Sequence, residues 1–334
     1  MTHSKMRREI LRGAIAAAAL SQFPARAQQY PSGNMRVIIP TGQGGGADRL
    51  ARVFDDFWGA LLKTHFEYQF MPGAAGQVGY ETYVGKMPRD GQHLLFGNMG
   101  PEMIMYALQK PSYKFPQDYQ YFCRLDVDDS IIFASRKSKF TKLEQVLEEA
   151  KKRTVNVAVS RLPHPASIGL LALARATGAR FNLIPYGGGN PTSVAVLNGE
   201  ADVGALPIAG VVAQKETLKV LGIFNDDHKM AAYSENAPSV NKVAGTKIPD
   251  LYSSRSWAVH TEFIEKRPKD FALLETTAKK VFDDPKYKEE YRKTGAPVET
   301  IQYGDRALCT KYSNHMIELA NEYRDLLSAK KGKG

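Results

Sequence analysis

The sequence has little of the material from which metal and nucleophilic centres are built. Only two of its 334 residues are cysteine, and its seven histidines are scattered singly. It contains no H-E-x-x-H, C-x-x-C or G-x-S-x-G segment, and so lacks the common signatures of zinc enzymes, thiol oxidoreductases and serine hydrolases. We expect no metal, no cofactor and no enzymatic activity.

The two cysteines, Cys123 and Cys309, stand too far apart in sequence to form a metal-binding pair. In an oxidising compartment they could form a disulfide. The alternative, which we favour, is that each is a small buried apolar residue.

Long apolar runs are also missing. After residue 27 no segment approaches 18 uninterrupted apolar residues, so we expect a soluble mature protein. Residues 1–27 instead have the layout of an export signal: a basic start, a short apolar run at Gly13–Leu20, and Ala25-Arg26-Ala27 as a cleavage site. The adjacent Arg7 and Arg8 approximate a twin-arginine signal, and an ordinary secretory signal is the alternative. Either predicts a periplasmic protein.

A concentrated basic surface is absent as well. The formal charge is +10, and the leader's five basic residues and one acid contribute +4, which leaves about +6 for the mature chain. No basic stripe is interleaved with aromatic residues, so we predict no nucleic-acid partner.

What the chain does have is a regular alternation of strand and helix patterns. This alternation predicts α/β layers with mainly parallel sheets flanked by helices. The predicted strands are Val37–Pro40, Phe66–Phe70, His93–Phe96, Ile131–Ser135, Val155–Val159, Phe181–Pro185, Asp202–Ala205 and Val220–Phe224. From about residue 267 the pattern is helical only.

The mature length exceeds a comfortable single core, so we expect two lobes. Candidate crossovers lie at Leu125–Ser130 and Ser253–Trp257. They place residues 28–127 together with 256–334 in lobe 1, and residues 128–255 in lobe 2.

The most informative local feature is the glycine-rich turn Thr41–Asp48, between an apolar strand and a helical pattern. Glycine amides and a helix N-terminus predict an anion site. The spacing Gly42-x-Gly44-x-x-Ala47 also matches a dinucleotide fingerprint, with Glu67 about 20 residues beyond the turn. An exported nucleotide-dependent oxidoreductase is therefore an alternative. Pro40, which ends the strand, and export argue against it.

Several ordered motifs then resemble one family. They are Val37–Pro40, Gly44–Asp48, Pro72–Gly76, Pro88–Gly91, Leu94–Gly97, Pro185–Gly189, Leu197–Asp202, Ser256-Trp257, Asp284-Pro285 and Gly295–Pro297. In this order and spacing, the mature chain resembles the substrate-binding receptors of tripartite tricarboxylate transporters, the Bug family, over almost all of residues 30–330.

The resemblance implies a two-lobed, type II-like periplasmic binding protein with its ligand cleft between the lobes. It implies a monomeric receptor that closes on a small organic carboxylate and delivers it to the membrane permease subunits of a tripartite transporter. The acid could be a dicarboxylate, a tricarboxylate or an aromatic carboxylate. A ligand-sensing accessory to a membrane sensor is a further alternative.

The same resemblance, with the loops that follow the strands, suggests the ligand-binding residues. They are Thr41, Gly42, Gln43, Gly44, Gly45, Gly46, Ala47, Asp48, Asn98, Met99, Ser160, Arg161, His164, Ser167, Tyr186, Gly187, Gly188, Gly189, Asn190 and Arg255. Arg161 and Arg255 stand where the family more often has small or polar residues. Because arginine can hold a carboxylate through two parallel hydrogen bonds, we hypothesise that one of them binds a distal carboxylate. A lobe–lobe or solvent contact is the alternative for each. Gly204 also departs from the family, which commonly has an acid there.

Overall fold

The computed structural model describes residues 30–328. The predicted export signal therefore lies outside the described residues. Within residues 30–328, no helix combines the length and the apolar run that crossing a bilayer requires.

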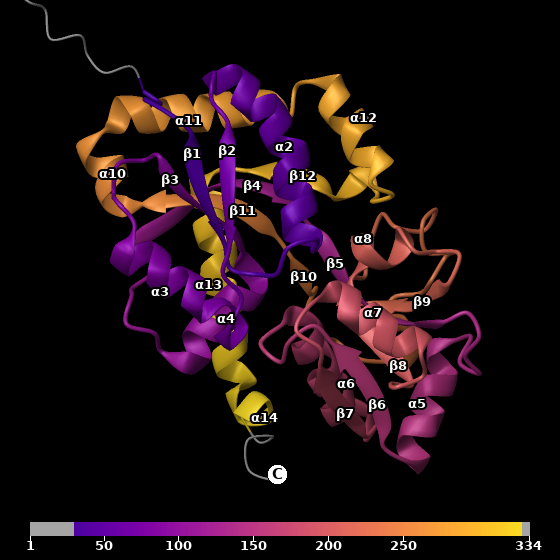
Figure 1. Ribbon diagram of the computed structural model, residues 1–334. Helices are drawn as coiled ribbons and strands as arrows, with labels where there is room; N and C mark the ends of the chain where they lie inside the picture. The colour runs from indigo at the N-terminus through magenta and orange to yellow at the C-terminus, as the bar shows by residue number, and fades with distance from the viewer. Residues whose placement is uncertain (1–29, 329–334) are drawn as a thin grey trace, which may run out of the picture.

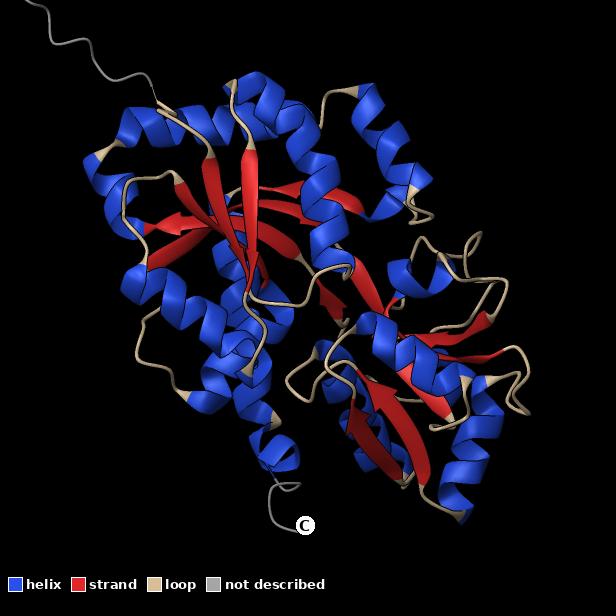
Figure 2. Cartoon of the chain, in the orientation of Figure 1, coloured by secondary structure: helices blue, strands red, loops and turns tan. Residues whose placement is uncertain are grey.

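Two six-stranded sheets, each covered by helices, form two lobes that lie side by side (Figures 1 and 2). The strands of the first sheet, in spatial order, are β12 (Ile301–Gly304), β4 (Tyr119–Asp126), β11 (Arg255–His260), β3 (His93–Asn98), β1 (Met35–Ile39) and β2 (Phe66–Phe70). Those of the second are β10 (Tyr252–Ser253), β5 (Asp128–Ser135), β8 (Val203–Pro207), β6 (Val155–Val159) and β7 (Phe181–Pro185), with β9 (Leu218–Ile223) also paired to β5.

The helices follow the same division. Those beside the first sheet are α2 (Gly46–Leu62), α3 (Gln77–Lys86), α4 (Met99–Gln109), α10 (Thr261–Lys266), α11 (Pro268–Val281), α12 (Pro285–Lys293), α13 (Arg306–Glu322) and α14 (Arg324–Ser328), with the short turns η1 (Ala74–Gly76) and η2 (Val298–Thr300). Those beside the second sheet are α5 (Leu143–Lys152), α6 (Pro165–Thr177), α7 (Gly189–Leu197), α8 (Ile208–Val212) and α9 (Val240–Ala244).

Both sheets are mixed rather than mainly parallel. In the first, β1 pairs with β2 and β3 in parallel, but β11 runs antiparallel to both β3 and β4. In the second, β6 pairs in parallel with β7 and β8, while β5 is antiparallel to β8 and β9. The antiparallel strands β4, β5 and β11 are those next to the points where the chain passes between the sheets. There a single residue, Val127 or Ser254, joins a strand of one sheet to a strand of the other, and no crossover helix lies between them.

The glycine turn lies at the carboxyl end of the parallel strand β1, where ligands of α/β proteins usually bind. Glu67 lies elsewhere. It is the second residue of β2, in register with Arg36 near the start of β1, and it accepts a hydrogen bond from Asn34 Nδ2 at 2.7 Å. An acid at the amino end of β2 is at the wrong edge of the sheet to meet a ribose bound at the turn. The dinucleotide interpretation therefore lacks the acidic residue that would bind the ribose.

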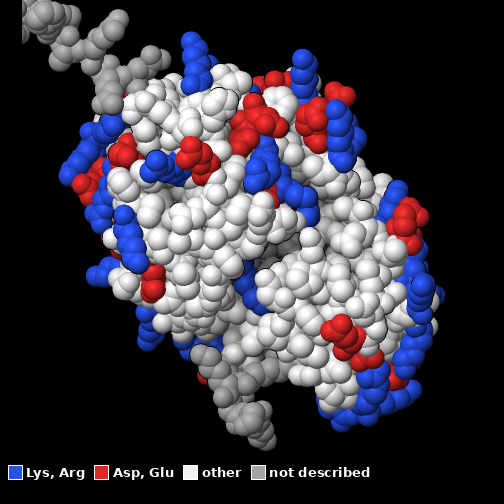
Figure 3. Space-filling model, in the orientation of Figure 1, with Lys and Arg blue, Asp and Glu red and all other residues white. Residues whose placement is uncertain are grey.

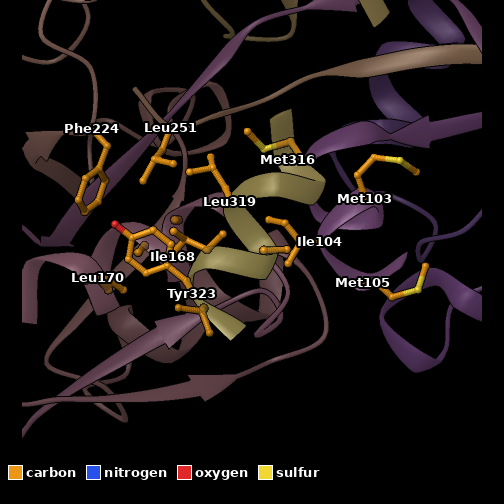
Figure 4. Close-up of a cluster of buried hydrophobic side chains, with 14 of the residues drawn as sticks. Met103, Ile104, Met105, Ile168, Leu170, Phe224, Leu251, Met316, Leu319 and Tyr323 are labelled. Atoms are coloured by element: carbon orange, nitrogen blue, oxygen red, sulfur yellow. The ribbon is translucent and has the colours of Figure 1, made fainter. Parts of the chain in front are cut away.

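A continuous apolar cluster joins the two lobes behind this edge. Met316, Leu319 and Tyr323, from α13 and the residue that follows it, pack with residues of lobe 2 that include Ile168 and Leu251 (Figure 4). The C-terminal helices thus lie against both lobes.

Candidate functional site

A cavity of about 850 Å³ lies between the two lobes and is visible as a hollow in Figure 3, with basic side chains at its margin. Residues of both sheets line it. From the predicted set these are Thr41, Gly42, Gln43, Gly45, Gly46, Ala47, Asn98, Ser160, Arg161, His164, Gly187, Gly188, Gly189, Asn190 and Arg255. The sequence-predicted loops are therefore brought together.

The remaining predicted residues do not line the cavity, although they lie near it in sequence. They are Gly44, Asp48, Met99, Ser167 and Tyr186. Asp48 is buried and accepts hydrogen bonds from Gly44 N at 2.8 Å and Arg52 Nε at 2.7 Å, which fixes the glycine turn from behind. Met99 is buried in the core, and Ser167 Oγ donates to the backbone oxygen of Arg161 at 3.2 Å. These residues shape the loops rather than the cavity wall.

Two helix N-termini from opposite lobes face the cavity without a side-chain cap. Helix α2 begins after Gly45 and helix α7 after Gly188, and neither N-cap residue has a side chain to accept a hydrogen bond from the first turn. Uncapped amides at a helix N-terminus favour a negatively charged group. The two turns also touch, because Asn190 Nδ2 donates to Gly44 O at 3.3 Å.

His164 lines the cavity and also caps a helix. It is the N-cap of α6, and its Nδ1 accepts a hydrogen bond from Ala166 N at 3.1 Å. Burial, followed by the charges of Arg161 and Arg255, lowers the pKa of His164 to about 3, so it is neutral at physiological pH. The N-terminus of α6, unlike those of α2 and α7, is therefore already capped by a side chain of the protein.

Arg161 connects the lobes. Its Nη1 donates to Ala75 O at 2.7 Å and its Nη2 donates to Glu102 Oε1 at 3.0 Å, and both acceptors belong to the first lobe. Glu102 is fully buried, and its Oε2 has no hydrogen-bond partner among the described residues. Burial raises the pKa of Glu102 to about 7, although Arg161 opposes this shift.

Arg255 is held at the junction between the sheets. Its Nη1 forms ion pairs with Asp126, the last residue of β4, and with Asp128 Oδ2 at 3.1 Å, at the start of β5. Asp128 Oδ1 also accepts a hydrogen bond from Ala209 N at 2.9 Å. Burial raises the pKa of Asp126 to about 6 against the influence of Arg255, whose own pKa the two aspartates raise despite its burial.

Some residues at the cavity were not in the predicted set. Arg49 lies in the first turn of α2 and lines the cavity, and its Nη1 donates to Gly44 O at 2.8 Å. Partial burial and the neighbouring charge of Arg255 lower the pKa of Arg49. The sequence could have indicated Arg49 as a cavity residue, because it directly follows the glycine turn. For the lining residues Gln214 and Tyr291 the sequence carried no signal.

Both cysteines are free and buried. Burial raises the pKa of Cys309 to about 11, and its sulfur lies 3.5 Å from Ser256 Oγ in the core. The favoured prediction of two unpaired buried thiols is confirmed.

No family model matches the sequence, but curated relatives do. Protein BugT of Bordetella pertussis is 26% identical over 253 residues, which is 74% of this chain and 76% of that protein. A UPF0065 protein from the tcbD-tcbE intergenic region of Pseudomonas sp. is 23% identical over 248 residues, 72% of each chain.

Solved structures agree in fold. A Rhodopseudomonas palustris protein with adipate superposes with a TM-score of 0.77 at 16% identity, covering 90% of this chain and 98% of that one. MatC of the same species, with bound malate, gives 0.74 at 19% identity, covering 88% and 99%. The periplasmic binding protein BugD gives 0.74 at 17% identity, covering 89% and 98%.

The chain has the two-lobed fold of periplasmic binding proteins, with a cavity between the lobes. Within that class, similarity to BugT and BugD confirms the resemblance to the Bug family that the sequence motifs carry.

Proposed function

We propose that the protein is a periplasmic receptor that captures a small organic carboxylate between its lobes and delivers it to a tripartite tricarboxylate-type membrane transporter. The observation that carries the proposal is the pair of uncapped helix N-termini, α2 and α7, that face one cavity from opposite lobes. Backbone amides in that arrangement suit a carboxylate, and the binding of malate and adipate by proteins of the same fold supports this choice.

Closure of the lobes is the functional event in this proposal. A ligand that contacts both helix N-termini binds the closed form better than the open form, and so shifts the population toward closure. The monomeric closed receptor is what the permease subunits recognise. A membrane sensor would recognise the same surface, so a sensing role is the second candidate.

A thermal-shift screen over organic acids tests the proposal. A ligand at 100 times its dissociation constant stabilises the folded state by about 2.7 kcal/mol, which raises the melting temperature measurably. The amide of each acid is the matched control, because it keeps the shape and removes the charge. A shift with an acid and none with its amide is the expected result. No shift with any acid would contradict the proposal.

A further inference from the structure

Arg255 is oriented by the protein with one side of its guanidinium unused. Asp126 and Asp128 both bind Nη1, and the backbone N–H of Arg255 donates to Asp126 Oδ1 at 2.6 Å. Nε is buried without a hydrogen-bond partner among the described residues, and the whole residue is only 8% exposed. Nη2 forms no hydrogen bond with the described residues either, and a charged N–H group of this kind can donate to a carboxylate.

The guanidinium lies against the N-terminus of α2, with Nη2 nearest to it. A Cβ built on Gly46, the first residue of the helix, would lie 3.2 Å from Arg255 Nη2 and 3.8 Å from Nε. A cation beside an uncapped helix N-terminus is electrostatically unfavourable unless an anion contacts both. The lack of a side chain at Gly46 lets the guanidinium lie close to the helix, and both line the cavity, where one carboxylate can contact Nη2 and the first-turn amides.

One further negative group would balance the charges around the cavity. Three arginines line it, and three buried acids lie beside them: Arg49, Arg161 and Arg255 against Glu102, Asp126 and Asp128. A further buried acid, Asp48 in the first turn of α2, is paired with Arg52. When these acids are ionised, the uncompensated charge comes from the N-termini of α2 and α7, about half an elementary charge each. One carboxylate balances that charge. A second carboxylate would compete with Glu102 for Arg161 or approach Asp128.

Part of the cavity wall contributed by lobe 2 is apolar. Lobe 2 contributes Pro185, Pro191, Leu206, Pro207, Ala209 and Ala213 to the lining. The volume of about 850 Å³ is in the upper part of the range for small-molecule sites. This wall has room for a hydrocarbon chain or ring.

We propose that the ligand is a monocarboxylic acid with an extended apolar body, its carboxylate bound by Nη2 of Arg255 and the first-turn amides of α2. The inference rests on the receptor function proposed above and specifies its ligand. Arg255 is then the residue that determines specificity, and Asp126 and Asp128 are positioning residues that orient it.

Calorimetry at pH 8 with matched acids tests the ligand class. The probes are hexanoate against adipate and benzoate against terephthalate, which share a body and differ in one carboxylate. We expect each monocarboxylate to bind about tenfold or more tightly than its dicarboxylate partner, since the second charge would be buried without a free cation. Octanoate should bind more tightly than hexanoate, by up to about fourfold per methylene.

Two variants test the carboxylate subsite. Gly46→Ala places a methyl group in the space beside Nη2 and should weaken monocarboxylate binding about tenfold or more while leaving the fold intact, because alanine suits a helix start. Arg255→Gln should weaken binding as strongly. Arg36→Gln is the matched control, because Arg36 lies on β1 with an exposed side chain, does not line the cavity and should leave affinity unchanged.

The outcomes separate the inference from the function. Tighter binding of the dicarboxylates, or unchanged affinity in Gly46→Ala, would overturn the monocarboxylate inference and leave the receptor function standing. No binding of any mono- or dicarboxylate by a folded protein would overturn the receptor function itself.

Discussion

At the scale of single residues, Glu102 shows how burial and charge set a titration. Its carboxyl group is fully buried in α4 and receives one hydrogen bond from Arg161. Burial outweighs Arg161 and raises the pKa from 4.5 to about 7. The folded protein therefore holds this proton more tightly than the unfolded chain does. The stabilising contribution of that proton is fully present below pH 4.5 and is lost as the pH rises to about 7.

Replacing Glu102 by glutamine should remove this pH dependence. The amide keeps the shape and cannot ionise, so the Glu102→Gln protein should gain stability relative to the wild type as the pH rises from 4.5 to 7. Urea unfolding of both proteins across that range measures the difference. Glu216→Gln, at an exposed loop position, is the control. A stability difference that stays constant with pH would show that Glu102 does not titrate in this window.

Several residue roles could be inferred from the sequence, and others could not. The glycine turn was recognisable because its residue types are local and have a clear physical meaning. The partners of Arg161 were not, because Ala75 and Glu102 are brought to it only by the meeting of two lobes. From the sequence, Gly204 could be identified only as a departure from the acid that the family commonly has there. In the fold its absent side chain makes room for Phe133, since a Cβ there would lie 2.3 Å from the ring.

At the scale of elements, the parallel strands followed from the sequence and the antiparallel ones mostly did not. Val155–Val159 and Phe181–Pro185 are apolar runs bounded by turn residues, and the structure has both with the predicted bounds. Tyr119–Asp126 mixes aromatic, polar and charged residues, so no strand was predicted there. The region after residue 267 is not purely helical, because β12 interrupts it at Ile301–Gly304 and completes the first sheet.

Helix α13 is the element whose packing is most informative to test. Leu319 is 4% exposed and belongs to the apolar cluster shared by the two lobes, whereas Leu308 on the same helix is 38% exposed. Leu319→Ala should lower the free energy of unfolding by about 2–4 kcal/mol through lost burial and a residual cavity.

The control for this prediction is Leu308→Ala, which should cost about 1 kcal/mol or less because more than a third of this residue is already exposed to water. Chemical denaturation of the three proteins measures both values. Equal losses for the two variants would mean that the contact of α13 with lobe 2 contributes little to stability.

At the scale of the whole molecule, the lobes are joined by contacts of two kinds. Behind the cavity, α13 and α14 belong to an apolar cluster that includes residues of both lobes (Figure 4). At the cavity itself the contacts are polar: Arg161 with Ala75 and Glu102, and Asn190 with Gly44. Polar contacts can be exchanged for water when the lobes separate, whereas the apolar cluster cannot be exposed without cost. Opening should therefore occur at the cavity and pivot about the C-terminal helices.

Removing the Arg161 contacts should favour the open form. Arg161→Gln loses an ion pair and a hydrogen bond that exist only when the lobes meet, which together contribute on the order of 1–3 kcal/mol to closure. Small-angle scattering of the ligand-free protein should then show a larger radius of gyration. Carboxylate affinity should fall about tenfold, because apparent affinity scales with the closed fraction.

The matched control for Arg161 is Arg180→Gln, which removes an exposed arginine of the same lobe whose hydrogen bond to Lys152 O stays within that lobe. It should change neither measurement, since no contact between the lobes is lost. The double variant Arg161→Gln, Glu102→Gln distinguishes the loss of the inter-lobe contacts from the effect of an unpaired buried charge. It lacks the Arg161 contacts and leaves no unpaired carboxylate at position 102. If the double variant restores stability and stays expanded, the inter-lobe contacts of Arg161 hold the closed form. If it returns to the wild-type radius, the expansion of the single variant came from the unpaired charge of Glu102, and closure depends on the ligand and the hinge alone.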